Sequence, residues 1–305
     1  DSGAVVTKSD GWTYIEVGEI TQTSPSSGQY GTVVTITGTN LFGGGASVQS
    51  VQLNDLEVLE IRTQSNTQLV VVVDDGEFGQ GDIVITADTG AYTVATNGFT
   101  YLSLGEIITV VPEFGLGGTR IVIEGDRLLG GGSSAELITL AGVEIAELVS
   151  LSDTLIRLVA GVHSVTGAGD VTIVSDTGSV VTKENAFTYY PRGVISSVTP
   201  NYGQLNTNVA LANDGSGSGL FGDGEGVASV TRAGVSAEIV GETTDDAINV
   251  IASAAEPGVG DIVITSTTGG RVSLVDGWTY KEQGSVLTVT PNSGREGTEV
   301  SIYGL

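Results

Sequence analysis

The segment most suggestive of chemistry is a glycine triplet within "NLFGGGAS", residues 40–47. Consecutive glycines after a β-branched run can cradle a phosphate with their backbone N–H groups, or they can form a sharp turn. Comparable segments occur at 127–134 ("RLLGGGSS") and 219–226 ("GLFGDGEG"). A phosphate loop also needs a helix after it and commonly a Lys. None of the three segments contains Lys and strand-like sequence follows each of them, so the pattern favours a turn.

Three aspartates each follow a glycine at the entrance of a strand-like segment: Asp82, Asp170 and Asp261. Two interpretations are open for them. Carboxylate oxygens are ligands that Ca²⁺ prefers, so these residues could bind calcium at a domain junction. Alternatively, an Asp at a turn accepts hydrogen bonds from nearby backbone N–H groups. The chain has no D-x-D-x-D cluster, and its absence favours the turn.

The residue types needed for most catalytic and metal sites are absent or rare. The chain has no Cys, no Met and a single His, His163. Disulfides, thiolate zinc sites and cysteine nucleophiles are therefore excluded, and His163 is expected to be an ordinary loop or strand residue. The acidic pairs in 74–77 ("DDGE") and 243–247 ("TTDDA") do not recur with a matching spacing, so we interpret them as solvated turns. These observations predict a protein that is not an enzyme and has no cofactor.

Hydroxyl groups are the remaining sites for modification. No N-x-S/T acceptor occurs in the chain, so ordinary N-glycosylation is not expected. O-linked sugar or proline modification is one interpretation of the remaining sites. Its candidates are Ser24, Pro25, Thr35, Thr37, Thr199, Pro200, Thr290 and Pro291. The alternative is that each proline only blocks hydrogen bonding at an edge strand.

The candidate residues belong to a chain that repeats itself. Prolines at positions 25, 112, 200 and 291 open similar segments, and the steps between them are 87, 88 and 91 residues. Segments of the type "GDIVIT" begin at 81, 169 and 260 in the same order. A fixed period of this length is the signature of a tandem array of structural units. A third landmark, "WTY" or "FTY", ends at Tyr14, Tyr101, Tyr189 and Tyr280.

Within each repeat, apolar residues alternate with a period of two, which is typical of strands with one buried face. In "TVVTITG" (32–38), Val34 and Ile36 point one way and Thr35 and Thr37 point the other. No stretch shows a convincing helical pattern. Six or seven short strands are expected in each repeat of about 88 residues, which is typical of a β-sandwich. The other aliphatic residues predicted to be buried are Ile121, Ile123, Val209 and Leu211. Trp12 and Trp278 align with Phe99 and Phe187 and are predicted to lie in the cores.

The pattern P-x-x-G-x-x-G-T-x-V-x-I-x-G-x-x-L, followed by "GDIVIT", "TG" and "FTY", resembles the IPT/TIG domain. This resemblance implies an all-β fold, a tandem array of immunoglobulin-like sandwiches. The third repeat departs from the pattern, because Asn206 and Asn213 replace glycine. The family includes plexin-type receptors, Rel-type transcription factors, accessory modules of starch-modifying enzymes and large surface proteins, so it does not determine the function. The repeats are expected at 18–104, 105–192 and 193–283, between a final hairpin at 1–17 and opening strands at 284–305.

Composition limits the partners and the location. The chain has 305 residues and a net charge of -25, which divides almost evenly among the three full repeats. Such a surface repels nucleic acid and anionic lipid, and no apolar run approaches the length of a membrane span. Few Lys and many Thr, Ser and Gly residues favour an extracellular or cell-surface protein.

We therefore predict a structural or adhesive protein, part of a long tandem-repeat stalk, surface fibre or filament. Its expected partners are other copies of itself or neighbouring repeats, and glycans are a further candidate. The alternative is a ligand-binding ectodomain, either receptor-like or a carbohydrate-binding module array. The partial repeats at 1–17 and 284–305 also lead us to expect a longer assembly, because a two-stranded piece is marginally stable in water.

Overall fold

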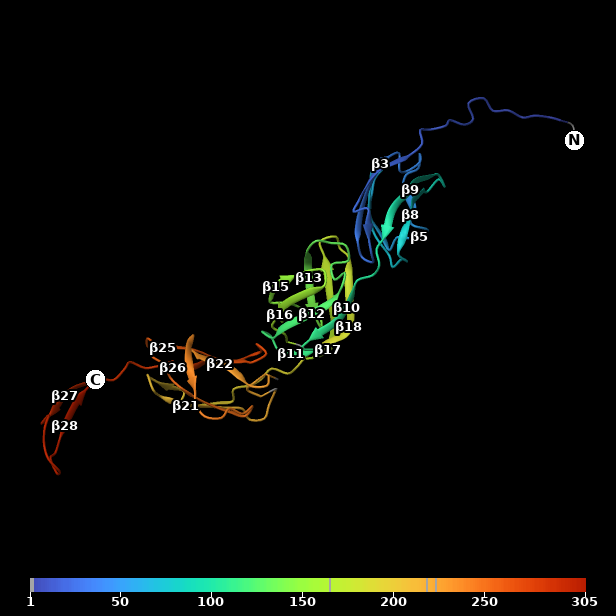
Figure 1. Ribbon diagram of the computed structural model, residues 1–305. Helices are drawn as coiled ribbons and strands as arrows, with labels where there is room; N and C mark the ends of the chain where they lie inside the picture. Colours follow the sequence, from blue (N-terminus) through green and yellow to red (C-terminus); the bar gives the residue numbers. More distant parts are fainter. Residues whose placement is uncertain (1–2, 165, 218, 223) are drawn as a thin grey trace.

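Three β-sandwiches follow one another along an extended string, and the two chain ends lie at its opposite ends (Figure 1). The computed structural model describes residues 3–164, 166–217, 219–222 and 224–305. Every regular element within these residues is a β-strand, which confirms the all-β prediction. The first, second and third sandwiches contain β1–β9, β10–β18 and β19–β26 respectively.

The first sandwich packs a four-stranded sheet, β1-β3-β7-β6, against a five-stranded sheet, β2-β9-β8-β4-β5. The chain passes from the first sheet to the second at Pro25, which follows a cis peptide bond, and β2 then pairs with β9 in parallel. The strands are β1 (Glu19–Ser24), β2 (Ser27–Gly28), β3 (Val33–Thr39), β4 (Val48–Leu53), β5 (Leu56–Glu57), β6 (Glu60–Gln64), β7 (Gln68–Val72), β8 (Gly79–Ala87) and β9 (Tyr92–Tyr101).

The second sandwich repeats this topology. Its sheets have the orders β10-β12-β16-β15 and β11-β18-β17-β13-β14, so each strand has a counterpart in the first sandwich. The strands are β10 (Glu106–Val111), β11 (Phe114–Gly115), β12 (Arg120–Asp126), β13 (Ala135–Leu140), β14 (Val143–Glu144), β15 (Glu147–Leu151), β16 (Leu155–Val159), β17 (Gly167–Ser175) and β18 (Val180–Tyr189).

The third sandwich differs in one respect: its two sheets are joined into an eight-stranded sheet, β19-β21-β24-β23-β22-β25-β26-β20. The joining strand β23 pairs with both β22 and β24. In the other sandwiches, two separate strands occupy this place. The strands are β19 (Ser197–Thr199), β20 (Tyr202–Gly203), β21 (Asn208–Ala212), β22 (Val227–Arg232), β23 (Val235–Ile239), β24 (Ala247–Ile251), β25 (Gly258–Ser266) and β26 (Arg271–Tyr280).

Each sandwich encloses its own apolar core. The alternation predicted from the sequence is confirmed, because all six aliphatic residues expected inside are at most 1% exposed: Val34, Ile36, Ile121, Ile123, Val209 and Leu211. Trp278 is fully buried, as predicted, and so are its equivalents Phe99 and Phe187.

The departure of the third repeat from the glycine pattern does not change its first turn. Asn206 has a φ of 67°, close to the left-handed conformation of Gly31 and Gly118. Its backbone N–H donates to the carbonyl of Ala252 at 2.8 Å, as that of Gly31 donates to Val73 at 3.0 Å. Asn tolerates this conformation better than other side chains do, so the turn is kept.

The prediction for Trp12 is wrong, because its side chain is 78% exposed. The described residues before Glu19 pair with no strand of the structure, so Trp12 has no sheet on which to pack. At the other end, β27 (Val286–Thr290) pairs only with β28 (Ser301–Gly304), and both are exposed. The described residues contain no helix with the length and apolar character needed to cross a membrane.

Candidate functional site at the domain junctions

The glycine triplet of the first sandwich forms a turn between β3 and β4. Gly43 and Gly44 have positive φ angles of 53° and 78°, which glycine adopts without steric cost. The carboxamide of Asn66 accepts a hydrogen bond from the N–H of Phe42 at 2.9 Å. Asp88 accepts another from the N–H of Ala46 at 3.1 Å. A strand follows the turn, so the arrangement lacks the helix terminus that a phosphate loop uses.

The same turn recurs in the other sandwiches. Asp153 accepts the N–H of Leu129 at 2.9 Å, and Asp245 accepts the N–H of Phe221 at 2.6 Å. The segment 243–247 is a solvated turn, as predicted, with Asp245 exposed, but the prediction that its acidic residues have no counterpart in the other repeats is wrong for Asp245. It occupies the place of Asp153 and Asn66, and the change between Asn and Asp hides this repeat in the sequence.

A second acidic residue also holds the glycine turn of the second sandwich. Asp176 accepts hydrogen bonds from the N–H of Ser133 at 2.9 Å and from its hydroxyl at 2.5 Å. The hydrogen bonds from Ser133 and Ser134 lower the pKa of Asp176 to about 2. This carboxylate is therefore ionised and fixed in orientation at neutral pH.

The glycine turn of the second sandwich lies against the tip of the first, at the boundary we call the first junction. The side chain of Gln29, which is 1% exposed, accepts a hydrogen bond from the N–H of Gly105 at 2.6 Å. It also donates to the carbonyl of Val180 at 3.2 Å. A Cβ at Gly130 would collide with Gln29 and Ser179. The glycine therefore makes room for the neighbouring sandwich.

Two backbone hydrogen bonds cross the first junction. Val33 donates to the carbonyl of Thr177 at 2.8 Å, and Val180 donates to that of Tyr30 at 3.1 Å. Gly31 and Gly178 allow this approach, because a Cβ on either would press against the backbone of the other.

The boundary between the second and third sandwiches, the second junction, has the same arrangement. The backbone N–H of Arg120 donates to the carbonyl of Thr268 at 3.0 Å, and the backbone N–H of Arg271 donates to that of Gly117 at 3.2 Å. These residues align with the pairs of the first junction. Leu116 takes the place of Gln29, is 1% exposed and belongs to the core of the third sandwich. We call the residue at this position, Gln29 or Leu116, the tip residue. It is polar at the first junction and apolar at the second.

His163 lies at the second junction. It is 3% exposed; its ring stacks on that of Tyr189, with centroids 4.2 Å apart, and Nε2 lies 2.9 Å from the carbonyl of Tyr190. The guanidinium of Arg192 donates to the carbonyl of His163. Desolvation lowers the pKa of His163 and Arg192 adds to this effect, while the hydrogen bond to Tyr190 opposes it. His163 is therefore a neutral packing residue at neutral pH.

The three aspartates considered as calcium ligands all make the same kind of hydrogen bond to the backbone. Each carboxylate accepts the N–H of a residue on the following strand: Asp82 from Asn97 at 2.8 Å, Asp170 from Asn185 at 2.9 Å and Asp261 from Asp276 at 2.9 Å. Among the described residues no group of three or more His, Cys, Asp or Glu side chains is placed to hold a metal ion. The arrangement matches the turn interpretation, while calcium binding stays an untested hypothesis.

The hydroxyl–proline pairs are accessible. Ser24, Thr199 and Thr290 are exposed, while Thr35 and Thr37 are half-buried on the outward face of β3. Strands β1, β10 and β19 end immediately before Pro25, Pro112 and Pro200 and lie at sheet edges. The four prolines Pro25, Pro112, Pro200 and Pro291 all follow cis peptide bonds.

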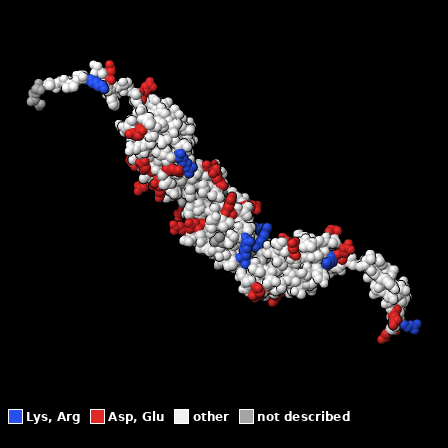
Figure 2. Space-filling view, turned by 180° about the vertical axis from the view of Figure 1, so that it is seen from behind, with Lys and Arg blue, Asp and Glu red and all other residues white. Residues whose placement is uncertain are grey.

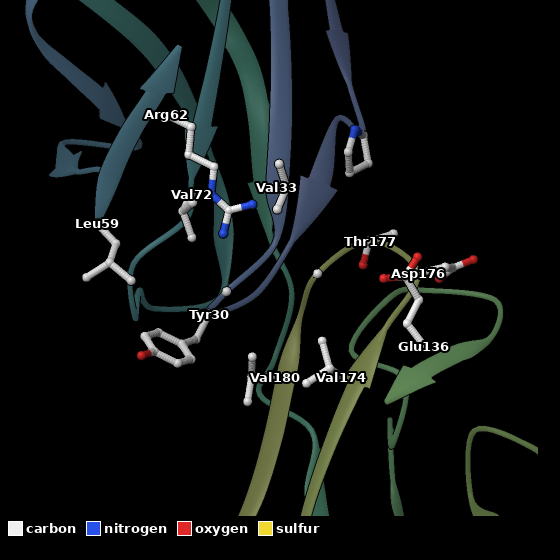
Figure 3. A pocket seen from close by; sticks show the side chains of 13 residues that line it. Tyr30, Val33, Leu59, Arg62, Val72, Glu136, Val174, Asp176, Thr177 and Val180 are labelled. Carbon is white, nitrogen blue, oxygen red and sulfur yellow. The ribbon is translucent and has the colours of Figure 1, made fainter. Parts of the chain in front are cut away.

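Charge is distributed along the whole string. Figure 2 shows acidic side chains on the visible face of all three sandwiches, with Lys and Arg gathered near the second junction. Arg120, Arg192 and Arg271 lie at that junction. Between the first two sandwiches, an open cleft of about 680 Å³ is lined by both of them (Figure 3).

The sequence profile of the IPT/TIG domain family matches residues 19–101, which are the first sandwich. No curated protein matches the chain. Among solved structures, the plexin A4 extracellular region is 16% identical, with a TM-score of 0.42; the match covers 97% of this chain and 28% of that one. A Bacteroides ovatus glucan-utilization protein, SGBP-B, solved with a mixed-linkage heptasaccharide, is 14% identical with a TM-score of 0.25, covering 87% and 67%. The I9–I11 tandem of titin is 10% identical with a TM-score of 0.26, covering 87% and 97%.

Proposed function

We propose that this chain, whose residues 19–101 form an IPT/TIG domain and whose second and third sandwiches repeat its design, is a non-enzymatic structural or adhesive protein outside the cell. In this proposal it forms part of a stalk, surface fibre or filament. The three complete domains of the array are residues 18–104, 105–192 and 193–283. Other copies of the chain or neighbouring repeats are its partners.

The observation that carries the proposal is the repeated junction. Both junctions use a pair of backbone hydrogen bonds, a buried tip residue and glycines that allow close approach. A neighbour held this way cannot rotate freely, and stacking of such units gives a quasi-one-dimensional array. The extended string in Figure 1 is the shape that a spacer requires.

The chemistry of the described side chains supports a role without catalysis. His163 is engaged in packing at a junction, and the acidic residues of the glycine turns accept backbone N–H groups. An active site needs convergent groups with free reactive atoms in a cleft.

Localisation tests the proposal on the source material. Antibodies raised against the 305-residue chain would be used for immunogold electron microscopy of intact cells. Gold along fibres, stalks or the cell boundary is expected. Gold confined to the cell interior would refute the extracellular role, and antibodies absorbed with the purified chain control for specificity.

A second candidate function, that of a ligand-binding ectodomain, is favoured by one observation: the first junction forms a cleft with charged and aromatic walls. Clefts between domains are common positions for ligand sites. The glucan-utilization protein named above was solved with a saccharide.

A further inference from the structure

The cleft at the first junction has an apolar floor and polar walls, contributed by two sandwiches (Figure 3). Val33 and Val72 from the first sandwich and Val174 and Val180 from the second form the floor. Its volume of about 680 Å³ lies in the range typical of small-ligand sites. A molecule bound there would contact both sandwiches.

The wall from the first sandwich combines a cation with an aromatic ring. Arg62 on β6 extends over the valines (Figure 3), and Glu60 contacts its Nε at 3.3 Å. Tyr30 is 38% exposed and Leu59 is 51% exposed at the same opening. A single exposed apolar side chain is ordinary, but these two line the same opening as the valines and form a contiguous apolar patch, which is informative.

The wall from the second sandwich carries two carboxylates. Glu136 is exposed on β13, and Asp176 follows β17. The hydrogen bonds from Ser133 hold the Asp176 carboxylate in place. The cleft thus has hydrogen-bond donors of Arg62 on one wall and two carboxylate acceptors on the other, of which Asp176 is held in place.

The second junction shows that the fold does not require these residues. Its backbone hydrogen bonds are the same, yet Arg62 is replaced by Val149 and Asp176 by Thr267. The strand registers of β6 with β7 and of β15 with β16 establish the first of these equivalences. The remaining wall residues Tyr30, Leu59 and Glu136 are replaced there by Gly117, Ala146 and Ala228.

We propose that the cleft at the first junction binds a neutral saccharide unit. A pyranose ring has hydroxyl groups that both donate and accept, so the guanidinium of Arg62 and the carboxylates of Glu136 and Asp176 can bind its edges. Its C–H face packs on Tyr30, Leu59 and the valine floor. The three carboxylates, counting Glu60, outnumber Arg62 and disfavour an anion, while the mixture of donors and acceptors suits hydroxyl groups, which donate and accept at once. This proposal deepens the second candidate function and does not depend on the first.

Calorimetric titration of the full 305-residue chain tests the proposal. The neutral probes are cellotetraose, maltotetraose and mannotetraose, while tetragalacturonate and a chitosan tetramer are the acidic and basic probes. We expect at least one neutral probe to bind with millimolar or better affinity, and to shift the backbone amide resonances of Tyr30, Arg62 and Thr177. Binding of only a charged probe, or of none, would overturn the proposal.

Variants place the binding in this cleft. Tyr30→Gly and Arg62→Val introduce the residues of the second junction, so the fold should be kept, and each is expected to weaken the neutral probe at least tenfold. Tyr92→Val, which removes an exposed tyrosine outside the cleft, is the matched control and should bind as the unmodified chain does. Unchanged affinity in both cleft variants would overturn the assignment. The immunogold experiment is unaffected by either result.

Discussion

The side chain of Leu116, from the second sandwich, packs over Gly222 of the third. A Cβ at Gly222 would lie 2.5 Å from Cδ1 of Leu116, and Leu116 belongs to the core of the third sandwich. Gly222 belongs to a glycine turn that resembles a phosphate loop in the sequence. This turn therefore leaves room for a side chain of the second sandwich. This relationship couples the stability of the third sandwich to an atom group outside it.

Leu116→Ala should destabilise the third sandwich more than the second, whose own strands do not enclose this side chain. Removing a buried leucine costs about 2–5 kcal/mol. Chemical denaturation followed through Trp278, which is buried in the third sandwich, measures the effect. Leu104→Ala, at a half-exposed linker position, is the control and should change little. Equal losses in the two variants would contradict this role of Leu116.

Gln29→Ala should loosen the first junction while leaving both adjoining sandwiches folded. The variant loses hydrogen bonds to Gly105 and Val180, each worth about 1 kcal/mol. ¹⁵N relaxation should show more independent tumbling of the first sandwich, and small-angle scattering should show a broader distribution of dimensions. Gln22→Ala, at an exposed position on β1, is the control. Unchanged relaxation in Gln29→Ala would mean that the two backbone hydrogen bonds alone fix the junction.

The sequence predicted the interior of each sandwich better than the contacts between sandwiches. Val34 and Ile36 are recognisable because alternation is a local pattern that recurs in every repeat. Gln29 is not, because its partner Val180 is 151 residues away and its equivalent in the next repeat is Leu116. Side chains at a junction adapt to one particular neighbour, so they vary while the strands repeat.

The sequence also identified the correct place of the glycine turns but not what holds them. Asn66, Asp153 and Asp245 perform the same capping in the three sandwiches, and their spacing follows the repeat. The signal was available in the alignment, but it required treating Asn and Asp as equivalent acceptors.

Arg232→Leu should stabilise the third sandwich. Arg232 is fully buried, its guanidinium lies 4.5 Å from the ring centroid of Trp278, and none of its three nitrogens has a hydrogen-bond partner. Leu53 and Leu140 occupy the aligned positions. An unsatisfied buried polar group costs about 1–3 kcal/mol or more when charged, so denaturation should require more urea in the variant.

The matched control for this substitution is Arg157→Leu, at an exposed position on β16, which should leave stability nearly unchanged. A loss of stability in Arg232→Leu would show that the contact with Trp278, together with bound water or an ion, outweighs the desolvation of the guanidinium.

Removal of divalent cations should leave the melting temperature unchanged. Asp82, Asp170 and Asp261 already accept backbone N–H groups, so folding does not require a metal to neutralise them. Differential scanning calorimetry with EDTA, and then with added Ca²⁺, measures this. A fall of many degrees with EDTA that Ca²⁺ reverses would establish the calcium interpretation, because a ligand bound only to the folded state stabilises it.

Acidification should weaken the second sandwich and the second junction through His163. Burial lowers the pKa of this residue below its ordinary value near 6.5, so the unfolded chain binds a proton more readily than the folded one. The contribution of His163 to stability is therefore fully present above that ordinary value and falls as the pH drops below it. In structural terms, protonation would place a second N–H at Nδ1, which has no partner. Melting temperatures between pH 7.5 and 5 should decline less in His163→Gln than in the unmodified chain. Parallel pH profiles for the two proteins would show that other groups carry the acid sensitivity.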